Sequence, residues 1–415
     1  MNRIVASTHC FREVLRRTSN QPGRIHEWPV GINRVNGNEE IILIPPGVNH
    51  GRYLRHIRLV FSESLSPSRR VAADPAALLI VDNDVHRGAI TGFRVLNSTT
   101  FEPMNSLYLA GPGLHQVPLS PSGIQPGSTH LVPPARLSRT VGALGQDAWE
   151  RIVRLQYVVV GVGRTGSLLA RMLLQLGIHH LSLVDFDEVE ETNLGEMADF
   201  VGQEDLGKQK VAAITEKLLV MYPEAEINAL RTSISNLAAL HVVKRSDVLF
   251  CCSDHDTARL MTTIVASMYC RVLIDAASGI SHESDSRIGV SIRLALPGRC
   301  LCCLGGLRME GTWDWLSSNE RGFHTGRIWT RERQGSLASV SNLSASLAMR
   351  CLEDLVLERL SESIWLQGEF SNGRLQVSYP RSNRDASECP ICSRLTGRGD
   401  DGLGDVPAIM QELCQ

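Results

Sequence analysis

The chain has 415 residues, 43% of them hydrophobic and 21% charged, with a formal net charge of −2. This composition is that of a soluble globular protein with room for two domains, and the charge gives no reason to expect nucleic acid or a membrane surface as a partner. No apolar run approaches the roughly 20 residues that cross a bilayer, and the first residues lack the apolar core of a secretory signal. We therefore expect a cytoplasmic protein whose eleven cysteines are thiols or metal ligands.

Short apolar runs in the first third of the chain, at 41–44 and 78–81, are separated by turn-forming residues. This spacing is typical of short strands with few helices between them. We predict a smaller N-terminal domain over residues 1–130, whose role the sequence does not reveal. A larger domain is expected over 131–395, followed by a C-terminal tail over 396–415.

The larger domain begins with the pattern of a βαβ unit. Tyr157–Val160 is a short apolar run typical of a buried strand, a glycine-rich turn follows, and residues 167–175 have helical apolar spacing up to Gly177. A second strand over 181–185 completes a right-handed unit with a parallel sheet. Further elements expected along the chain are strands over 248–252 and 272–275, an antiparallel strand at the sheet edge over 289–296, and a helix over 343–360. The predicted fold is α/β, a doubly wound, Rossmann-like, mostly parallel sheet with helices on both faces.

The turn Gly161-Val162-Gly163-Arg164-Thr165-Gly166 has the spacing of a nucleotide-binding loop. Gly161 allows the tight turn, Gly163 lets a phosphate approach the backbone, and Gly166 allows close helix packing. The helix start offers unpaired N–H groups to an anion. Asp185 lies nineteen residues past Gly166, where an acid that binds ribose is expected. The pattern predicts a bound nucleotide.

These features fit both NAD and ATP, and two later residues favour ATP. Lys210 and Asp254 both follow the glycine-rich turn, and Asp254 comes directly after a strand, where ligands of an open α/β sheet gather. A lysine can neutralise charge on a transferring phosphorus and a carboxylate can hold Mg²⁺. An NAD-dependent oxidoreductase would leave both residues without a purpose.

Residues 136 to about 392 resemble the adenylating domain of the ThiF and MoeB proteins and of ubiquitin-activating enzymes. The motifs that carry the resemblance occur in the family's order along the chain. They are RLSRTVGALGQDAWERI (136–152), VVVGVGRTGS (158–167), LVDFDEVEETNL (183–194), LGKQKV (206–211), CCSD (251–254) and two Cys-x-x-Cys pairs.

The resemblance implies transfer of AMP from ATP to a carboxylate, with release of pyrophosphate. By position, Asp185 would bind the ATP ribose, Asp187 and Asn193 would line the nucleotide site, Lys210 would contact the phosphates and Asp254 would bind Mg²⁺. The substrate would be a ubiquitin-like or sulfur-carrier protein with a C-terminal glycine, and a conjugating enzyme is a further expected partner. An arginine matching Arg139 reaches the partner's ATP site in such proteins, which implies a homodimer.

One position departs from the family. The family has an arginine two residues after Asn-Leu, where it contacts ATP phosphates, whereas this sequence has Gly195-Glu196. A carboxylate at that place would repel phosphate. Arg164, inside the glycine-rich turn, is the candidate substitute by position.

Four cysteines form two pairs with metal-binding spacing, Cys300 with Cys303 and Cys389 with Cys392. Two such pairs are the usual source of a tetrahedral zinc site with four thiolates and no open position. We therefore predict a structural Zn²⁺ whose removal lowers stability.

Two alternatives to the activation of a carrier protein remain open for the function. Residues 304–350, where many ubiquitin-activating relatives carry the cysteine that forms a thioester, contain no cysteine. The substrate could be a short peptide or small carboxylate held by the N-terminal part. The chain could also be a non-catalytic scaffold that binds nucleotide or protein, for which Glu196 is the best support. Pyrophosphate exchange separates these alternatives.

Overall fold

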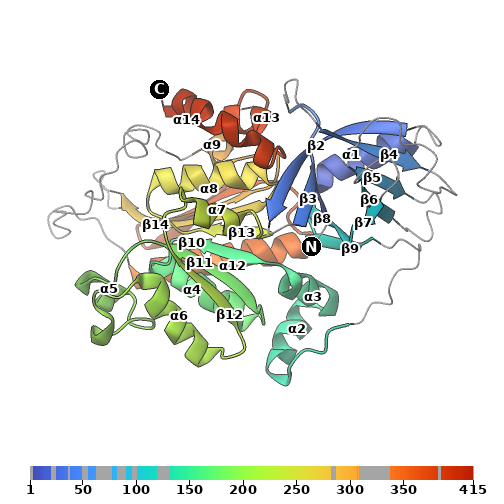
Figure 1. Cartoon of the computed structure of the whole chain (residues 1–415). Helices are drawn as coiled ribbons and strands as arrows, with labels where there is room; N and C mark the ends of the chain where they lie inside the picture. The colour runs from blue at the N-terminus through green and yellow to red at the C-terminus, as the bar shows by residue number, and fades with distance from the viewer. Residues whose placement is uncertain are drawn as a thin grey trace.

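The computed structural model describes residues 3–19, 25–35, 38–48, 55–61, 77–81, 90–95, 101–119, 130–281, 287–305, 307, 337–381 and 385–414, and the structural statements below concern these ranges. The chain is built around two β-sheets, one formed by the N-terminal third and one by the rest (Figure 1).

The second sheet has eight strands in the order β12-β11-β10-β13-β14-β15-β16-β17. The first five pair in parallel and the last three are added antiparallel. The strands are β10 (Tyr157–Val160), β11 (His180–Asp185), β12 (Glu226–Arg231), β13 (Val248–Cys251), β14 (Val272–Ser281), β15 (Arg287–Ala295), β16 (Ile364–Ser371) and β17 (Arg374–Ser378). The predicted doubly wound, Rossmann-like sheet is confirmed for its five parallel strands.

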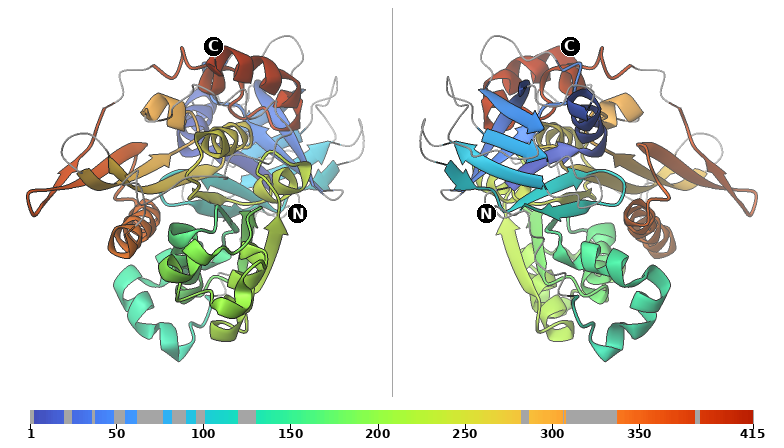
Figure 2. Two further views of the ribbon diagram at one scale, coloured as in Figure 1. Left: turned by 90° about the vertical axis from the view of Figure 1, so that its left-hand side faces the viewer. Right: turned by 90° about the vertical axis from the view of Figure 1, so that its right-hand side faces the viewer.

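Helices cover both faces of this sheet (Figure 2). On one face lie α4 (Arg164–Gln175), α6 (Lys210–Met221) and α12 (Ala338–Val356), and on the other lie α7 (Leu237–Val243) and α8 (Asp256–Met268). All four residues of β10 are buried between these layers, which explains its continuous apolar sequence. The remaining helical segments of this part are η2 (Ala135–Leu137), α2 (Ser138–Leu144), α3 (Gln146–Arg154), α5 (Glu191–Glu196), η3 (Gln203–Asp205) and α9 (Leu301–Leu304).

Two sequence predictions need correction. The strand expected at the sheet edge, β15, is antiparallel as predicted but lies inside the sheet, because β16 and β17 extend the sheet beyond it. Helix α12 begins and ends earlier than the predicted 343–360. It ends because Glu358 takes a positive φ of 60°, which a continuing helix does not allow.

In its described residues, the N-terminal third forms a nine-stranded sheet in the order β7-β6-β5-β4-β2-β3-β1-β8-β9, with one helix packed on it. The expected short strands are therefore present. They are β1 (Arg3–Ser7), β2 (Ile25–Val35), β3 (Asn38–Leu43), β4 (Arg55–Phe61), β5 (Ala77–Val81), β6 (Ile90–Val95), β7 (Phe101–Pro103), β8 (Ser106–Ala110) and β9 (His115–Pro118), and the helix is α1 (Thr8–Ser19).

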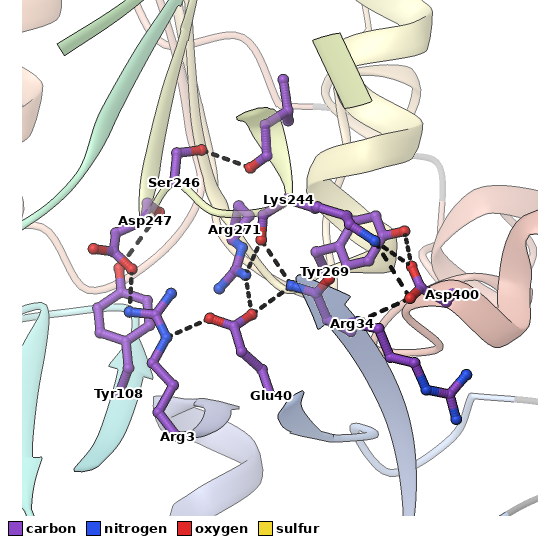
Figure 3. Close-up of polar contacts among 12 residues, drawn as sticks. Arg3, Arg34, Glu40, Tyr108, Lys244, Ser246, Asp247, Tyr269, Arg271 and Asp400 are labelled. Carbon is purple, nitrogen blue, oxygen red and sulfur yellow. Dashed lines mark hydrogen bonds and ion pairs between the residues drawn. The ribbon is translucent and has the colours of Figure 1, made fainter. Parts of the chain in front are cut away.

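The two sheets meet through a buried network of charged side chains (Figure 3). Glu40 of β3 accepts hydrogen bonds from Arg3 of β1 and from Arg271, which lies just before β14. Arg3 also pairs with Asp247, at 2.7 Å, just before β13. Arg271 has no exposed side-chain surface and Asp247 has 1%. The N-terminal sheet is thus attached where the parallel strands begin.

The C-terminal segment packs onto this same region. It consists of α13 (Pro390–Arg394), η4 (Asp400–Asp405) and α14 (Val406–Cys414). Leu395, Ile409 and Met410 are buried in the main hydrophobic core.

Candidate functional site

The glycine-rich turn connects β10 to α4 and has the shape that its glycines allow. Gly161 adopts a φ of +84°, and a Cβ on it would lie 2.9 Å from the Cys252 carbonyl carbon. A Cβ on Gly166 would lie 1.9 Å from the Gly161 carbonyl oxygen. Gly163, by contrast, has nothing within 4 Å of its Cβ position. The turn is therefore closely packed at Gly161 and Gly166 and open at Gly163. Helix α4 starts at this open position, where its first N–H groups are exposed.

An acidic cluster with one lysine lies beside this turn. The Asp185 carboxylate accepts hydrogen bonds from the Val162 and Asp187 N–H groups, each at 2.8 Å. Lys210 Nζ donates to Asp187 Oδ2 at 2.9 Å, and only 12% of the Lys210 side chain is exposed. Asp185 ties β11 directly to the turn, so the cluster and the turn form one rigid unit.

The charges of this cluster affect one another. Burial opposes the charge of Lys210, but the Asp187 and Asp185 carboxylates outweigh it and raise the pKa of Lys210. Burial raises the pKa of Asp185, with a smaller contribution from Asp187 in the same direction, while Lys210 lowers it. Lys210 therefore stays an ammonium group beside the turn.

Arg164 and Glu196 lie close to this cluster. Only 11% of the Arg164 side chain is exposed, and its nearest polar atoms are Asn342 Oδ1 at 3.5 Å and Asp199 Oδ2 at 3.9 Å. Its Nε is buried and has no hydrogen-bond acceptor among the described residues. Burial raises the pKa of Glu196, against the opposing effect of Arg164 and Lys210. The Arg164 guanidinium thus lies beside the cluster with only long contacts to Asn342 and Asp199.

Asp254 follows β13 in the loop that packs against the Gly161 turn. Its side chain is 83% exposed, and His255 Nε2 lies 3.8 Å from Asp254 Oδ1. An exposed carboxylate at the end of a parallel strand has the oxygen ligands that Mg²⁺ requires. Asp254 would thus offer Mg²⁺ an exposed oxygen ligand.

Two predicted site residues have other surroundings in this structure. Asn193 Oδ1 accepts from the Glu190 N–H at 2.9 Å and caps α5, so its side chain holds the helix start. Arg139 lies exposed on α2, a helix with no buried residue. An exposed helix of this kind leaves Arg139 free to reach another molecule.

The four predicted cysteines come together in one buried cluster. The Sγ atoms of Cys300, Cys303, Cys389 and Cys392 all lie within 4.8 Å of one another, with Cys300–Cys389 and Cys303–Cys392 separations of 3.5 Å each. Four converging thiol groups are the donor set of a closed tetrahedral Zn²⁺ site. The residues present therefore fit zinc, and all four would hold it.

The cysteine cluster and the glycine-rich turn lie at opposite ends of the strands of this sheet. Strand β15 runs antiparallel to β14, so that its last residue, Ala295, pairs with Leu273 near the start of β14. Cys300 follows five residues later, whereas the turn lies where β10 ends. The length of the strands therefore separates the cysteine cluster from the glycine-rich turn. This separation favours a structural role for a metal held by the cysteines.

Two cysteines outside the cluster, Cys251 and Cys351, are poor candidates for a nucleophile. Burial raises the pKa of Cys251 and of Cys351 to about 12 each, which keeps both as thiols. Cys351 is 5% exposed, as expected for a core residue of α12. The side chain of Cys414 lies outside the described residues.

The segment that carries this geometry has known relatives. Residues 137–310 match the model of the ThiF family, so this segment of the chain is similar to that family. Over 164 residues the chain is 25% identical to the sulfur carrier protein adenylyltransferase of Thermus thermophilus, covering 39% of this chain and 59% of that protein. It is 28% identical over 166 residues to ubiquitin-like modifier-activating enzyme 5 of Gallus gallus, covering 37% and 40%.

The chain therefore spans less than two thirds of the length of these relatives. Among solved structures, E. coli MccB is similar with a TM-score of 0.47 and 19% identity, over 66% of this chain and 75% of that one. Among the helices of the described ranges, none has the length and apolar character needed to cross a membrane.

Proposed function

We propose that this protein transfers AMP from ATP to the C-terminal carboxylate of a ubiquitin-like or sulfur-carrier protein. The observation that carries the proposal is the placement of Lys210, a largely buried and charged lysine, beside an open glycine-rich turn. The names of the relatives support it, because both the Thermus and the Gallus protein are named for activating a small carrier or modifier protein.

In this reaction the protein needs only to position the reactants and to stabilise negative charge on the phosphates. A carboxylate oxygen of the substrate attacks the α-phosphorus in line, a new P–O bond forms, and the bond to pyrophosphate breaks with its electron pair leaving on pyrophosphate. The carboxylate is already ionised near neutral pH, so no general base is required. Lys210 and Arg164 would stabilise negative charge on the phosphates, and Mg²⁺ held by Asp254 would supply further positive charge.

Arg139 extends the proposal to a second copy of the chain. It is exposed on α2, and it matches an arginine that completes a partner's nucleotide site in this family. We include a homodimer in the proposal for this reason. A conjugating enzyme as acceptor of the activated group belongs to the same proposal.

The test is mass spectrometry of candidate carrier proteins after incubation with this protein, ATP and Mg²⁺. A carrier that ends in glycine should gain the mass of an AMP group. If a thiol or amine is present and displaces AMP, the carrier should instead gain the mass of the attached thiol or amine compound. The same carrier without its C-terminal glycine is the matched control and should stay unmodified. Turnover of short peptides alone would instead identify a peptide-adenylating enzyme.

A non-catalytic scaffold is the competing proposal, and the position of Glu196 near Arg164 and Lys210 favours it. A carboxylate there competes with phosphate for both cations. The scaffold would bind ATP without exchanging pyrophosphate in the presence of any carrier, which is the result that overturns the enzymatic proposal.

Arg164→Ala should lower the rate of ATP–pyrophosphate exchange by roughly 10- to 100-fold, because a preorganised cation beside the phosphates is lost. Arg164→Lys keeps the charge and should recover part of the rate. Thermal melting of each variant checks that the fold is intact. An exchange rate equal to wild type in Arg164→Ala would show that Arg164 does not replace the family arginine.

A further inference from the structure

The chain leaves the cysteine cluster directly into a segment that crosses to the N-terminal sheet. We call residues 395–405 the strap. At its start, the Leu395 N–H donates to the Ile391 carbonyl at 2.9 Å and Thr396 Oγ1 donates to the Cys392 carbonyl at 3.0 Å. Both residues are fully buried. The strap therefore begins on the helix that carries the second cysteine pair.

The middle of the strap lies between α8 and β2 in direct backbone contact. The Gly397 N–H donates to the Ser267 carbonyl at 3.0 Å, and the Gly399 N–H to the Met268 carbonyl at 2.8 Å. On the other side Gly399 forms a parallel bridge with Ile32. A Cβ on Gly31 would lie 2.2 Å from the Gly397 carbonyl oxygen, so no side chain fits between strap and strand.

Asp400 ties the strap to three elements at once (Figure 3). Its carboxylate accepts from the Arg34 backbone N–H at 2.9 Å, from Tyr269 OH at 2.7 Å and from Lys244 Nζ at 3.0 Å. The side chains of Lys244 and Asp400 are 6% and 18% exposed. A shielded, charge-assisted site of this kind is worth more than an exposed ion pair.

We propose that the four-cysteine metal site is the anchor of this strap, and that metal loading sets how tightly the N-terminal sheet is held on the α/β sheet. Without metal, weak thiol–thiol hydrogen bonds, Cys300–Cys389 and Cys303–Cys392 at 3.5 Å each, link the two pairs in place of metal–thiolate bonds. The helix α13 and the strap that follows it then lose their fixed end. This inference does not depend on the proposed adenylation.

Hydrogen–deuterium exchange on the full-length protein tests the proposal, with the zinc-loaded form compared with the form after chelation. Peptides covering 25–35 and 397–405 should exchange about tenfold faster after chelation, the size of a typical coupling between two sites. Peptides covering 157–160 should change little. Unchanged exchange in 25–35, with loss of protection confined to the cysteine segments, would overturn the proposal.

Coupling is reciprocal, so a loosened strap must also weaken metal retention. Asp400→Asn should release zinc to a colorimetric chelator about tenfold faster than wild type. Asp401→Asn is the matched control, because Asp401 is the exposed neighbour on the same turn, and its release rate should equal wild type. If chelation unfolds the whole protein, this release experiment decides: equal rates in Asp400→Asn and wild type overturn the proposal.

Discussion

Lys210→Ala should reduce ATP–pyrophosphate exchange by about 100- to 1,000-fold, measured with a carrier protein present. The reason is that Lys210 is nearly buried, charged and held beside the turn by Asp187. A fixed charge in a site with little water stabilises a transition state far better than a mobile charge does. Removal of one such group lowers the rate of known enzymes by about 100- to 1,000-fold.

Lys208→Ala is the matched control for this experiment. Lys208 lies two residues away, but its side chain is 43% exposed and pairs with Asp205 away from the turn. Its exchange rate should stay within about twofold of wild type, because an exposed ion pair contributes little. Equal rates in Lys208→Ala and Lys210→Ala would contradict the phosphate site that we propose.

Glu40→Gln should lower the free energy of unfolding by about 3 to 5 kcal/mol, because it leaves Arg3 and Arg271 buried without their shared counter-ion. Urea unfolding at pH 7 gives the difference. Glu226→Gln is the control, because Glu226 is 78% exposed in a pair at the sheet edge, and it should change the free energy by less than about 0.5 kcal/mol.

The difference in unfolding free energy between wild type and Glu40→Gln should also depend on pH. Burial alone would raise the pKa of Glu40, but Arg271, Arg3 and Asn33 outweigh it and lower the pKa from 4.5 to about 2. A lowered carboxylate pKa stabilises the fold fully above the unfolded pKa of 4.5, and this stabilisation is lost as the pH falls toward 2. The difference between wild type and Glu40→Gln should therefore shrink between pH 4.5 and 2. A constant difference would show that folding does not lower the pKa of Glu40.

Local sequence patterns predicted much of the α/β part. The strand before Gly161, the helix after it and the strand up to Asp185 all lie within about 30 residues, where apolar spacing and glycine position are direct consequences of the local backbone. The cysteine pairs were predictable for a different reason: metal ligation restricts spacing within each pair, and only thiol chemistry then links pairs that lie far apart.

The contacts that sequence patterns did not predict join residues far apart along the chain. Glu40 and Arg271 are 231 residues apart, and Arg164 and Asn342 are 178 apart. Each of these residues alone has the features of an ordinary surface charge or helix residue, because its partner is set by how whole elements pack. The inside position of β15 was missed for a related reason, since two later strands cover its edge.

The network between the two sheets also limits how such a chain can change over generations. Arg271 and Asp247 belong to the ThiF-type half, yet their counter-charges Glu40 and Arg3 are supplied by the other half. Recombination could exchange either half of the chain for that of a relative. A buried charged side chain would then face a surface without the opposite charge that it needs. The two halves are therefore expected to be inherited together, and residues 3, 40, 247 and 271 to vary as matched sets among relatives that keep both sheets.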